Sequence, residues 1–153
     1  MSYLSELRAI VGHRPLLSAG ATVIVIKDEK ILLNLRSDTN TWGIPGGGTE
    51  LGETLEETAR RELKEETGLS AEKLNLLTVL SGKDYYFEYP NGDMLYSVIA
   101  LYKAENISGY LESTDGESKA LKYFSVTDLP KLESRAKCII DLLIQNHSDL
   151  FHI

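Results

Sequence analysis

The chain has 153 residues, which suits one folded domain over residues 1–153 with a core of ordinary size. Hydrophobic residues make up 42% and charged residues 25%, a balance that excludes a disordered chain. The formal net charge of -7 argues against binding of long nucleic acid, because a phosphate backbone is held chiefly by Lys and Arg. A small phosphorylated ligand is still compatible, since one local cation site can outweigh the net charge.

Cysteine content and hydrophobic run lengths set the expected environment. Cys138 is the only cysteine, so an internal disulfide and a thiolate metal cluster are both excluded. The longest aliphatic run, ATVIVI, is far too short to span a bilayer, and the first residues contain no apolar signal core. We therefore expect a soluble, cytoplasmic protein without a membrane partner.

The first half of the chain predicts a helix, a hairpin, a loop and a second helix. Residues 2–11 are expected to form a short helix. Residues 20–36, GATVIVIKDEKILLNLR, contain two β-branched runs around the charged turn at 28–30, which favours a β-hairpin. Residues 39–48, TNTWGIPGGG, predict a loop, because proline and three successive glycines continue neither element. The helix after it is expected to stop at Gly68.

The second half predicts strands followed by a helix. Residues 74–80 resemble a strand, and residues 85–105 contain two aromatic and β-branched runs around Pro-Asn-Gly-Asp at 90–93, which favours a tight hairpin. Residues 120–126 predict a further strand. From Pro130 onward, apolar residues recur at helical spacing. The order predicts an α/β or α+β layered domain, with helices packed on a mixed sheet.

The acidic stretch GGGTELGETLEETARRELKEETGL, residues 46–69, contains a well-delimited helix. Thr54 followed by Glu57 is a capping box, in which a hydroxyl and a carboxylate satisfy N–H groups that the first turn leaves free. Gly68 is a typical C-terminal stop. With both ends of the helix located, the position of each residue around the helix axis follows from its place in the sequence.

Two glutamates share the inner face of this helix. At about 100° per residue, with Leu55 at zero, Ala59 falls near ~40°, Glu62 near ~340° and Glu66 near ~20°. Glu65 flanks that stripe near ~280°. An ordinary solvated acidic helix would place its carboxylates on the outer face. Because two buried like charges repel, we interpret Glu62, Glu65 and Glu66 as a hard oxygen site for Mg²⁺ or Mn²⁺.

These residues resemble a known motif. Gly47, Glu53 and the segment RELKEETGL at 61–69 reproduce the Nudix box, G-x5-E-x7-R-E-U-x-E-E-x-G-U, where U is a bulky aliphatic residue. All nine constrained positions are met. The flanking WGIPGG at 42–47 and the late KYFS at 122–125 are also similar to the family. The resemblance covers nearly the whole chain.

The resemblance implies a Nudix fold, an α/β/α sandwich whose mixed sheet carries a loop–helix–loop catalytic motif. It implies hydrolysis of a nucleoside diphosphate linked to another group, by water activated with Mg²⁺ or Mn²⁺. Nucleoside triphosphates and ADP-ribose are examples of such substrates. The catalytic and metal-ligating residues implied are Glu53, Arg61, Glu62, Glu65, Glu66 and Glu117, with the backbone carbonyl of Gly46 as a further ligand.

Within that set, roles differ. The resemblance makes Glu62, Glu65 and Glu66 metal ligands, and gives Arg61 the task of orienting Glu53 by charge-assisted hydrogen bonds. The general base is open between Glu62 and Glu117, the latter in the Asp-Gly-Glu loop before the late strand. Glu117 as a simple loop charge is an equal alternative.

The substrate contacts are the least determined. Arg36, at the end of a predicted strand, is a candidate for a phosphate contact or a solvated cation. The aromatic residues of the hairpin are candidates for stacking on a nucleobase, although strand alternation would place half of them in the core; they are Tyr85, Tyr86, Phe87 and Tyr89. A small nucleotide is the expected partner, and the N-terminal segment or the aromatic hairpin could support a homodimer.

Three functions remain open from the sequence. The first is a metal-dependent Nudix pyrophosphohydrolase. The second is a non-catalytic nucleotide-binding sensor on a Nudix scaffold, although such proteins usually lack some glutamates of the box. The third is a simple divalent-cation binder, which would not require Arg61.

Overall fold

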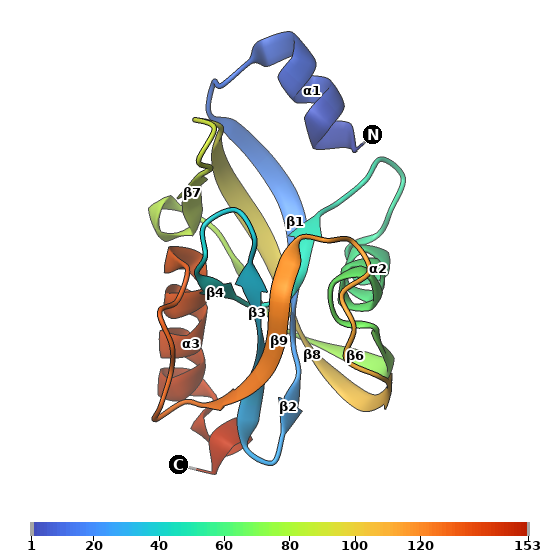
Figure 1. The fold of residues 1–153 in the computed structure, drawn as a ribbon, viewed down its shortest axis with the longest axis vertical. Helices are drawn as coiled ribbons and strands as arrows, with labels where there is room; N and C mark the ends of the chain where they lie inside the picture. The colour runs from blue at the N-terminus through green and yellow to red at the C-terminus, as the bar shows by residue number, and fades with distance from the viewer. Residues whose placement is uncertain (1, 153) are drawn as a thin grey trace.

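The computed structural model describes residues 2–152, and places its β-strands between two helices (Figure 1). Helix α2 (Leu55–Thr67) lies on one side of the strands and helix α3 (Ser134–Asn146) on the other. Helix α1 (Tyr3–Val11) lies at one end of the molecule, beside the start of β1. This arrangement confirms the expected mixed, layered α/β fold.

One sheet carries most of the strands. Its order is β5-β1-β8-β6, and β7 also pairs with β8. Strands β1 and β8 are parallel, whereas β5, β6 and β7 run antiparallel to their neighbours, so the sheet is mixed. The strands are β1 (Leu16–Ile24), β5 (Gly46–Gly48), β6 (Leu69–Leu80), β7 (Tyr86–Glu88) and β8 (Met94–Gly109).

A second sheet is built around β3, which pairs with β2, β4 and β9. The predicted turn at 28–30 is present, and Asp28 and Glu29 both have positive φ. However, the predicted hairpin at 20–36 divides at Val25, because β1 pairs with β8 while β2 pairs with β3. The strands are β2 (Ile26–Lys27), β3 (Lys30–Arg36), β4 (Trp42–Gly43) and β9 (Ser118–Ser125).

The sheets are packed on both sides by apolar clusters. The cluster under α2 contains Ala59 and Leu63 of that helix, both almost completely buried. The cluster under α3 contains Ile140 and Leu143, also buried, together with Phe151 from the 3₁₀ turn Ser148–Phe151. Burying each large aliphatic side chain contributes about 1.5–3 kcal/mol. These contacts hold α2 rigidly against the sheet.

The predicted loop at 39–48 was wrong in one respect, because two short strands, β4 and β5, lie within it. Its glycines pair directly with β1, with Gly46 opposite Thr22 and Gly47 opposite Ala21. A Cβ at Gly46 would meet the carbonyl oxygen of Ala21, so the missing side chain permits this approach. The backbone of β5 is thereby held beside α2.

The remaining boundaries are close to those expected. The helix predicted at 2–11 is α1, the strand predicted at 120–126 is β9, and the aromatic hairpin is β7–β8. The strand predicted at 74–80 begins earlier, directly after α2, as β6. No helix among residues 2–152 is long and apolar enough to cross a membrane.

Candidate active site

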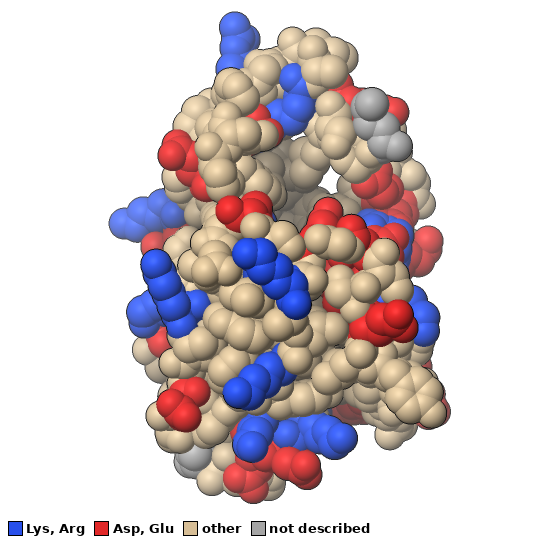
Figure 2. All heavy atoms as spheres, in the orientation of Figure 1, with Lys and Arg blue, Asp and Glu red and all other residues tan. Residues whose placement is uncertain are grey.

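A cavity of about 810 Å³ opens between α1 and the sheets. Figure 2 shows the hollow beneath the end of the molecule that carries α1, with acidic residues along one side. Its walls include the inner carboxylates of α2, the glycines of β5 and the first residues of α3. Helix α1 has no buried residue and is held over the cavity by hydrogen bonds, including Tyr3 N to Glu50 Oε2 at 2.9 Å.

The ends of α2 are fixed as the sequence predicted. Thr54 is the N-cap, and its hydroxyl oxygen accepts a hydrogen bond from the backbone N–H of Glu57 at 3.1 Å. Gly68 ends the helix with φ of 77°, a left-handed conformation that favours glycine. Leu55, expected on the inner stripe, is 37% exposed instead, because it is at the first turn beyond the edge of the core.

Glu66 is the most buried carboxylate of the site. Its side chain is almost enclosed, and the residue is only 6% exposed. Oε2 accepts a hydrogen bond from the backbone N–H of Gly46 at 3.0 Å. Burial, followed by the charge of Glu62, raises the pKa of Glu66 well above its usual range. A positive charge beside these oxygens would remove that penalty.

Glu62 lies one turn earlier and is also buried. Its carboxylate occupies the space in which a side chain at Gly47 would lie, so a larger residue there would force that carboxylate to move. Arg61 Nη1 donates to Glu62 Oε1 at 2.8 Å. Burial raises the pKa of Glu62, and the interaction with Arg61 opposes that shift. The sequence prediction that both glutamates face inward is confirmed.

Arg61 connects the carboxylates. Its Nε and Nη2 donate to the two oxygens of Glu53 at 2.7 and 2.9 Å, and Nη2 also donates to the Gly48 carbonyl at 3.0 Å. These hydrogen bonds are the main reason that the pKa of Glu53 falls to about 2. The contact expected from the sequence is therefore present. Glu65 lies at the edge of this group, 3.4 Å from Arg61 Nη1, and its side chain is 45% exposed.

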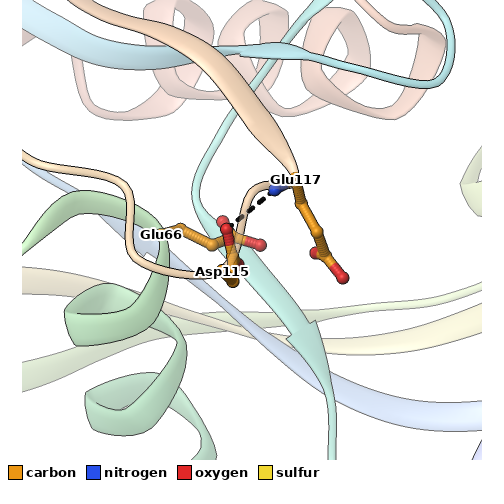
Figure 3. Close-up of side chains that lie close together, drawn as sticks. All are labelled: Glu66, Asp115 and Glu117. Atoms are coloured by element: carbon orange, nitrogen blue, oxygen red, sulfur yellow. Dashed lines mark hydrogen bonds between the residues drawn. The ribbon is translucent and has the colours of Figure 1, made fainter.

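The loop before β9 brings two more carboxylates to Glu66 (Figure 3). One oxygen each from Glu66, Asp115 and Glu117 lies within 4.8 Å of the others. The loop is anchored on α2 by the backbone N–H of Thr114, which donates to the Glu65 carbonyl at 2.9 Å. Glu117 N–H donates to Asp115 Oδ1 at 3.0 Å. Burial and the charge of Asp115 raise the pKa of Glu117.

This acidic cluster, defined as Glu62, Glu66, Asp115 and Glu117, fits a hard divalent cation. Its carboxylate oxygens come from α2 and from the loop before β9, and Glu62, Glu66 and Glu117 line the cavity. Carboxylate oxygen is the donor chemistry that Mg²⁺ and Mn²⁺ prefer. Asp115 was not predicted as a ligand. Gly46 reaches Glu66 through its N–H group, so a role for the Gly46 carbonyl stays a prediction.

Only some of the predicted substrate contacts line the cavity. Arg36 lines the cavity, donates to both oxygens of Asp38 at 2.9 and 2.7 Å, and lies 4.8 Å from the centre of the Phe87 ring. Tyr85 and Phe87 are both buried, and neither lines the cavity. Tyr85 belongs to the core under α3, because the 3₁₀ turn Lys83–Tyr85 interrupts strand alternation. Tyr89 is the aromatic residue of this segment that reaches the cavity.

Three cavity residues were missed in the sequence. Asn34 on β3 is buried and donates to Ser118 Oγ at 2.9 Å, while its Oδ1 has no partner among the described residues. Glu133 is buried and caps α3, and Arg135 follows on the first turn of that helix. The sequence contains no clear signal for these residues, because glutamate is not a typical N-cap residue and their position at the cavity depends on how α3 packs against the strands.

Comparison with known proteins agrees with this geometry. The family model that describes the NUDIX domain matches residues 16–143 of this sequence. The chain belongs to the Nudix family. It is 39% identical to an ADP-ribose pyrophosphatase of Methanocaldococcus jannaschii over 112 residues, which are 71% of this chain and 62% of that protein. The matched region thus spans about three-fifths of that relative's length.

Two further Nudix relatives were found. A putative 8-oxo-dGTP diphosphatase of Bacillus subtilis is 49% identical over 53 residues, or 34% of this chain and 36% of that protein. The crystal structure of a MutT NUDIX hydrolase from Burkholderia pseudomallei superposes with a TM-score of 0.70 at 28% identity. That superposition covers 82% of this Nudix chain and 97% of the other.

Proposed function

We propose that this Nudix chain is a pyrophosphohydrolase that cleaves a nucleoside diphosphate linked to another group, using water and Mg²⁺ or Mn²⁺. The observation that carries the proposal is the convergence of buried Glu62 and Glu66, which line a nucleotide-sized cavity, with the loop carboxylates of Asp115 and Glu117. A site of this volume lies in the range usual for small-molecule ligands. The intact carboxylate set favours catalysis over a sensor that only binds.

Glu62, Glu66 and Asp115 of the acidic cluster would hold the cation, with Glu65 and the Gly46 carbonyl as outer candidates. A divalent ion there would neutralise phosphate charge and lower the pKa of a coordinated water. Arg61 serves the cluster by fixing the rotamers of Glu53 and Glu62 through four hydrogen bonds to two carboxylates and a carbonyl. The neighbouring carboxylates are thereby positioned before substrate binds.

Glu117 is the better candidate for the proton acceptor. Its carboxylate makes no side-chain hydrogen bond among the described residues, whereas Glu62 is engaged by Arg61. Its raised pKa also brings it closer to neutrality, where a general base works best. We expect Glu117→Gln to lower kcat by about 10²-fold or more with little effect on KM. An unchanged kcat would return this role to Glu62.

The substrate is proposed to be a small nucleotide, with ADP-ribose first among the candidates. The support is the similarity to an ADP-ribose pyrophosphatase over most of this chain. An oxidised purine triphosphate is the second candidate, because the short match to a putative 8-oxo-dGTP diphosphatase is the more identical one. Tyr89 is positioned to stack on a base or sugar at the cavity wall.

The proposed function is tested by measuring products from a substrate panel. The panel contains ADP-ribose, 8-oxo-dGTP, dGTP, diadenosine polyphosphates and NADH, each assayed with Mg²⁺, with Mn²⁺ and with EDTA. We expect metal-dependent release of AMP and ribose 5-phosphate from ADP-ribose at a rate well above that for the other compounds. Tight binding across the panel without cleavage would contradict the enzyme and favour the nucleotide sensor.

A further inference from the structure

Arg135 presents unused hydrogen-bond donors to the cavity from a segment far from the Nudix box. It lies on the first turn of α3, and its side chain is only 14% exposed. Nε donates to Glu133 Oε1 at 2.9 Å. Within residues 2–152, neither Nη1 nor Nη2 of Arg135 meets an acceptor, and the residue lines the cavity. One edge of the guanidinium is therefore held, and the other is free.

Free donors at this depth are costly. A guanidinium carries five N–H donors and no acceptor, and it stays charged at any physiological pH. Leaving enclosed donors without a partner is unfavourable, more so when the group is charged. An oxyanion that enters the cavity would supply the missing acceptors in the planar, two-oxygen geometry that arginine binds best.

Arg36 provides a second guanidinium that contacts the same aromatic ring and lines the same cavity. The two groups lie 4.3 and 4.8 Å from the centre of the same buried Phe87 ring, Arg135 being the closer. Contact with an aromatic face uses the face of the guanidinium and leaves its N–H edge available. Asp38 accepts from Nε and Nη2 of Arg36, as Glu133 accepts from Arg135, so Nη1 of Arg36 also remains unused among the described contacts.

Arg36 lies beside the acidic cluster. Ser37, the residue after Arg36, donates its backbone N–H to the Glu117 carbonyl at 2.9 Å, which ties the two regions together. Both regions contribute to the wall of one cavity. A diphosphate has two adjacent phosphoryl groups, and the cavity thus contains two different environments for them, one carboxylate-rich and one formed by guanidinium edges.

We propose that Arg135, with Arg36, forms an oxyanion site for the phosphoryl group that the acidic cluster does not hold. The assignment of that ligand as the second phosphoryl group of the substrate rests on the proposed function. Asp38 and Glu133 orient the two guanidinium groups, and the phosphoryl oxygens complete their hydrogen bonding. Binding at this site requires no metal ion.

The test is a calorimetric titration of metal-stripped protein with inorganic pyrophosphate. Without metal, the acidic cluster repels the probe, so the arginine pair is the site that is measured. We expect Arg135→Gln to weaken pyrophosphate binding about tenfold, and Arg135→Lys, which keeps the charge but not the fork, to weaken it less. Arg14→Gln, a matched change at an exposed arginine, should bind as wild type does.

Thermal unfolding of each variant shows whether α3 still packs against the sheet. If Arg135→Gln is unstable, the binding measurement is made on Arg135→Lys instead. Equal pyrophosphate affinity in wild type and in a folded Arg135 variant would overturn the proposal. If wild type cleaves ADP-ribose but its KM is unchanged in Arg135→Gln, the oxyanion site fails while the enzyme stands. If wild type binds pyrophosphate through Arg135 but cleaves nothing, the oxyanion site stands and the proposed function fails.

Discussion

Replacing Glu66 by Gln separates two consequences of the acidic cluster. The carboxylate is almost fully buried, and its pKa is raised by burial and by the charge of Glu62. Glutamine keeps the size of the side chain and an oxygen that accepts the Gly46 N–H bond. The substitution therefore removes an ionisable carboxyl group and one strong metal ligand while changing little else.

The expected gain in stability follows from the distances. The carboxylate oxygens of Glu66, Asp115 and Glu117 lie within 4.8 Å of one another. At the upper end of that distance, two like charges repel by ~3.5 kcal/mol at an effective dielectric constant of about 20. The two loop carboxylates are exposed, so solvent screens much of that energy. We expect Glu66→Gln to stabilise the metal-free protein by about 1–2 kcal/mol, which raises its thermal midpoint by about 3–6 °C.

The assay pairs thermal unfolding in EDTA with turnover in Mn²⁺. Turnover of Glu66→Gln should fall by about 10²-fold or more, because a cation ligand is lost. Glu56→Gln is the matched control on the solvated face of the same helix, where only a 3.5 Å surface pair with Arg60 is lost. If Glu66→Gln lowered the midpoint in EDTA and retained wild-type turnover, our interpretation of the cluster would be refuted.

Three further perturbations address the same network. In EDTA, the free energy of unfolding should decrease as pH rises above the usual pKa range of a glutamate, because the raised pKa of Glu66 favours the protonated form in the folded state. Denaturant titrations at several pH values would show a flat profile if Glu66 ionised normally. Arg61→Lys should lower turnover about 10–100-fold in initial-rate assays, since lysine cannot bridge both oxygens of Glu53; full activity would contradict its orienting role. Gly47→Ala should lower the free energy of unfolding by about 1–3 kcal/mol in urea titrations, because the added Cβ meets the Glu62 carboxylate. An unchanged free energy of unfolding would show that β5 can move away from α2.

The helix that carries the site could be predicted because its determinants are local. Thr54 and Gly68 mark its ends, and the period of 3.6 residues places Glu62 and Glu66 on the buried face. The loop expected around Pro45 was partly a strand, since a glycine run has no propensity of its own and pairs when a neighbouring backbone can approach.

The rest of the site depends on contacts between distant segments. Asp115 joins Glu66 only because the loop before β9 is anchored on the end of α2 through Thr114. Arg135 reaches the cavity only because α3 packs over Phe87. Tyr85 was misplaced for a related reason. A 3₁₀ turn rotates Tyr85 into the core, and neither periodicity nor composition indicates such a turn.

The most direct test of the central claim is a Mn²⁺ titration followed by the electron paramagnetic resonance of the free ion. We predict that the wild-type protein binds at least one Mn²⁺ per chain. Glu66→Gln and Asp115→Asn should each release it at the same concentration, because both residues supply oxygens to the cluster. Retention of Mn²⁺ by both variants, or its absence from the wild type, would contradict the assignment of this cluster as the metal site.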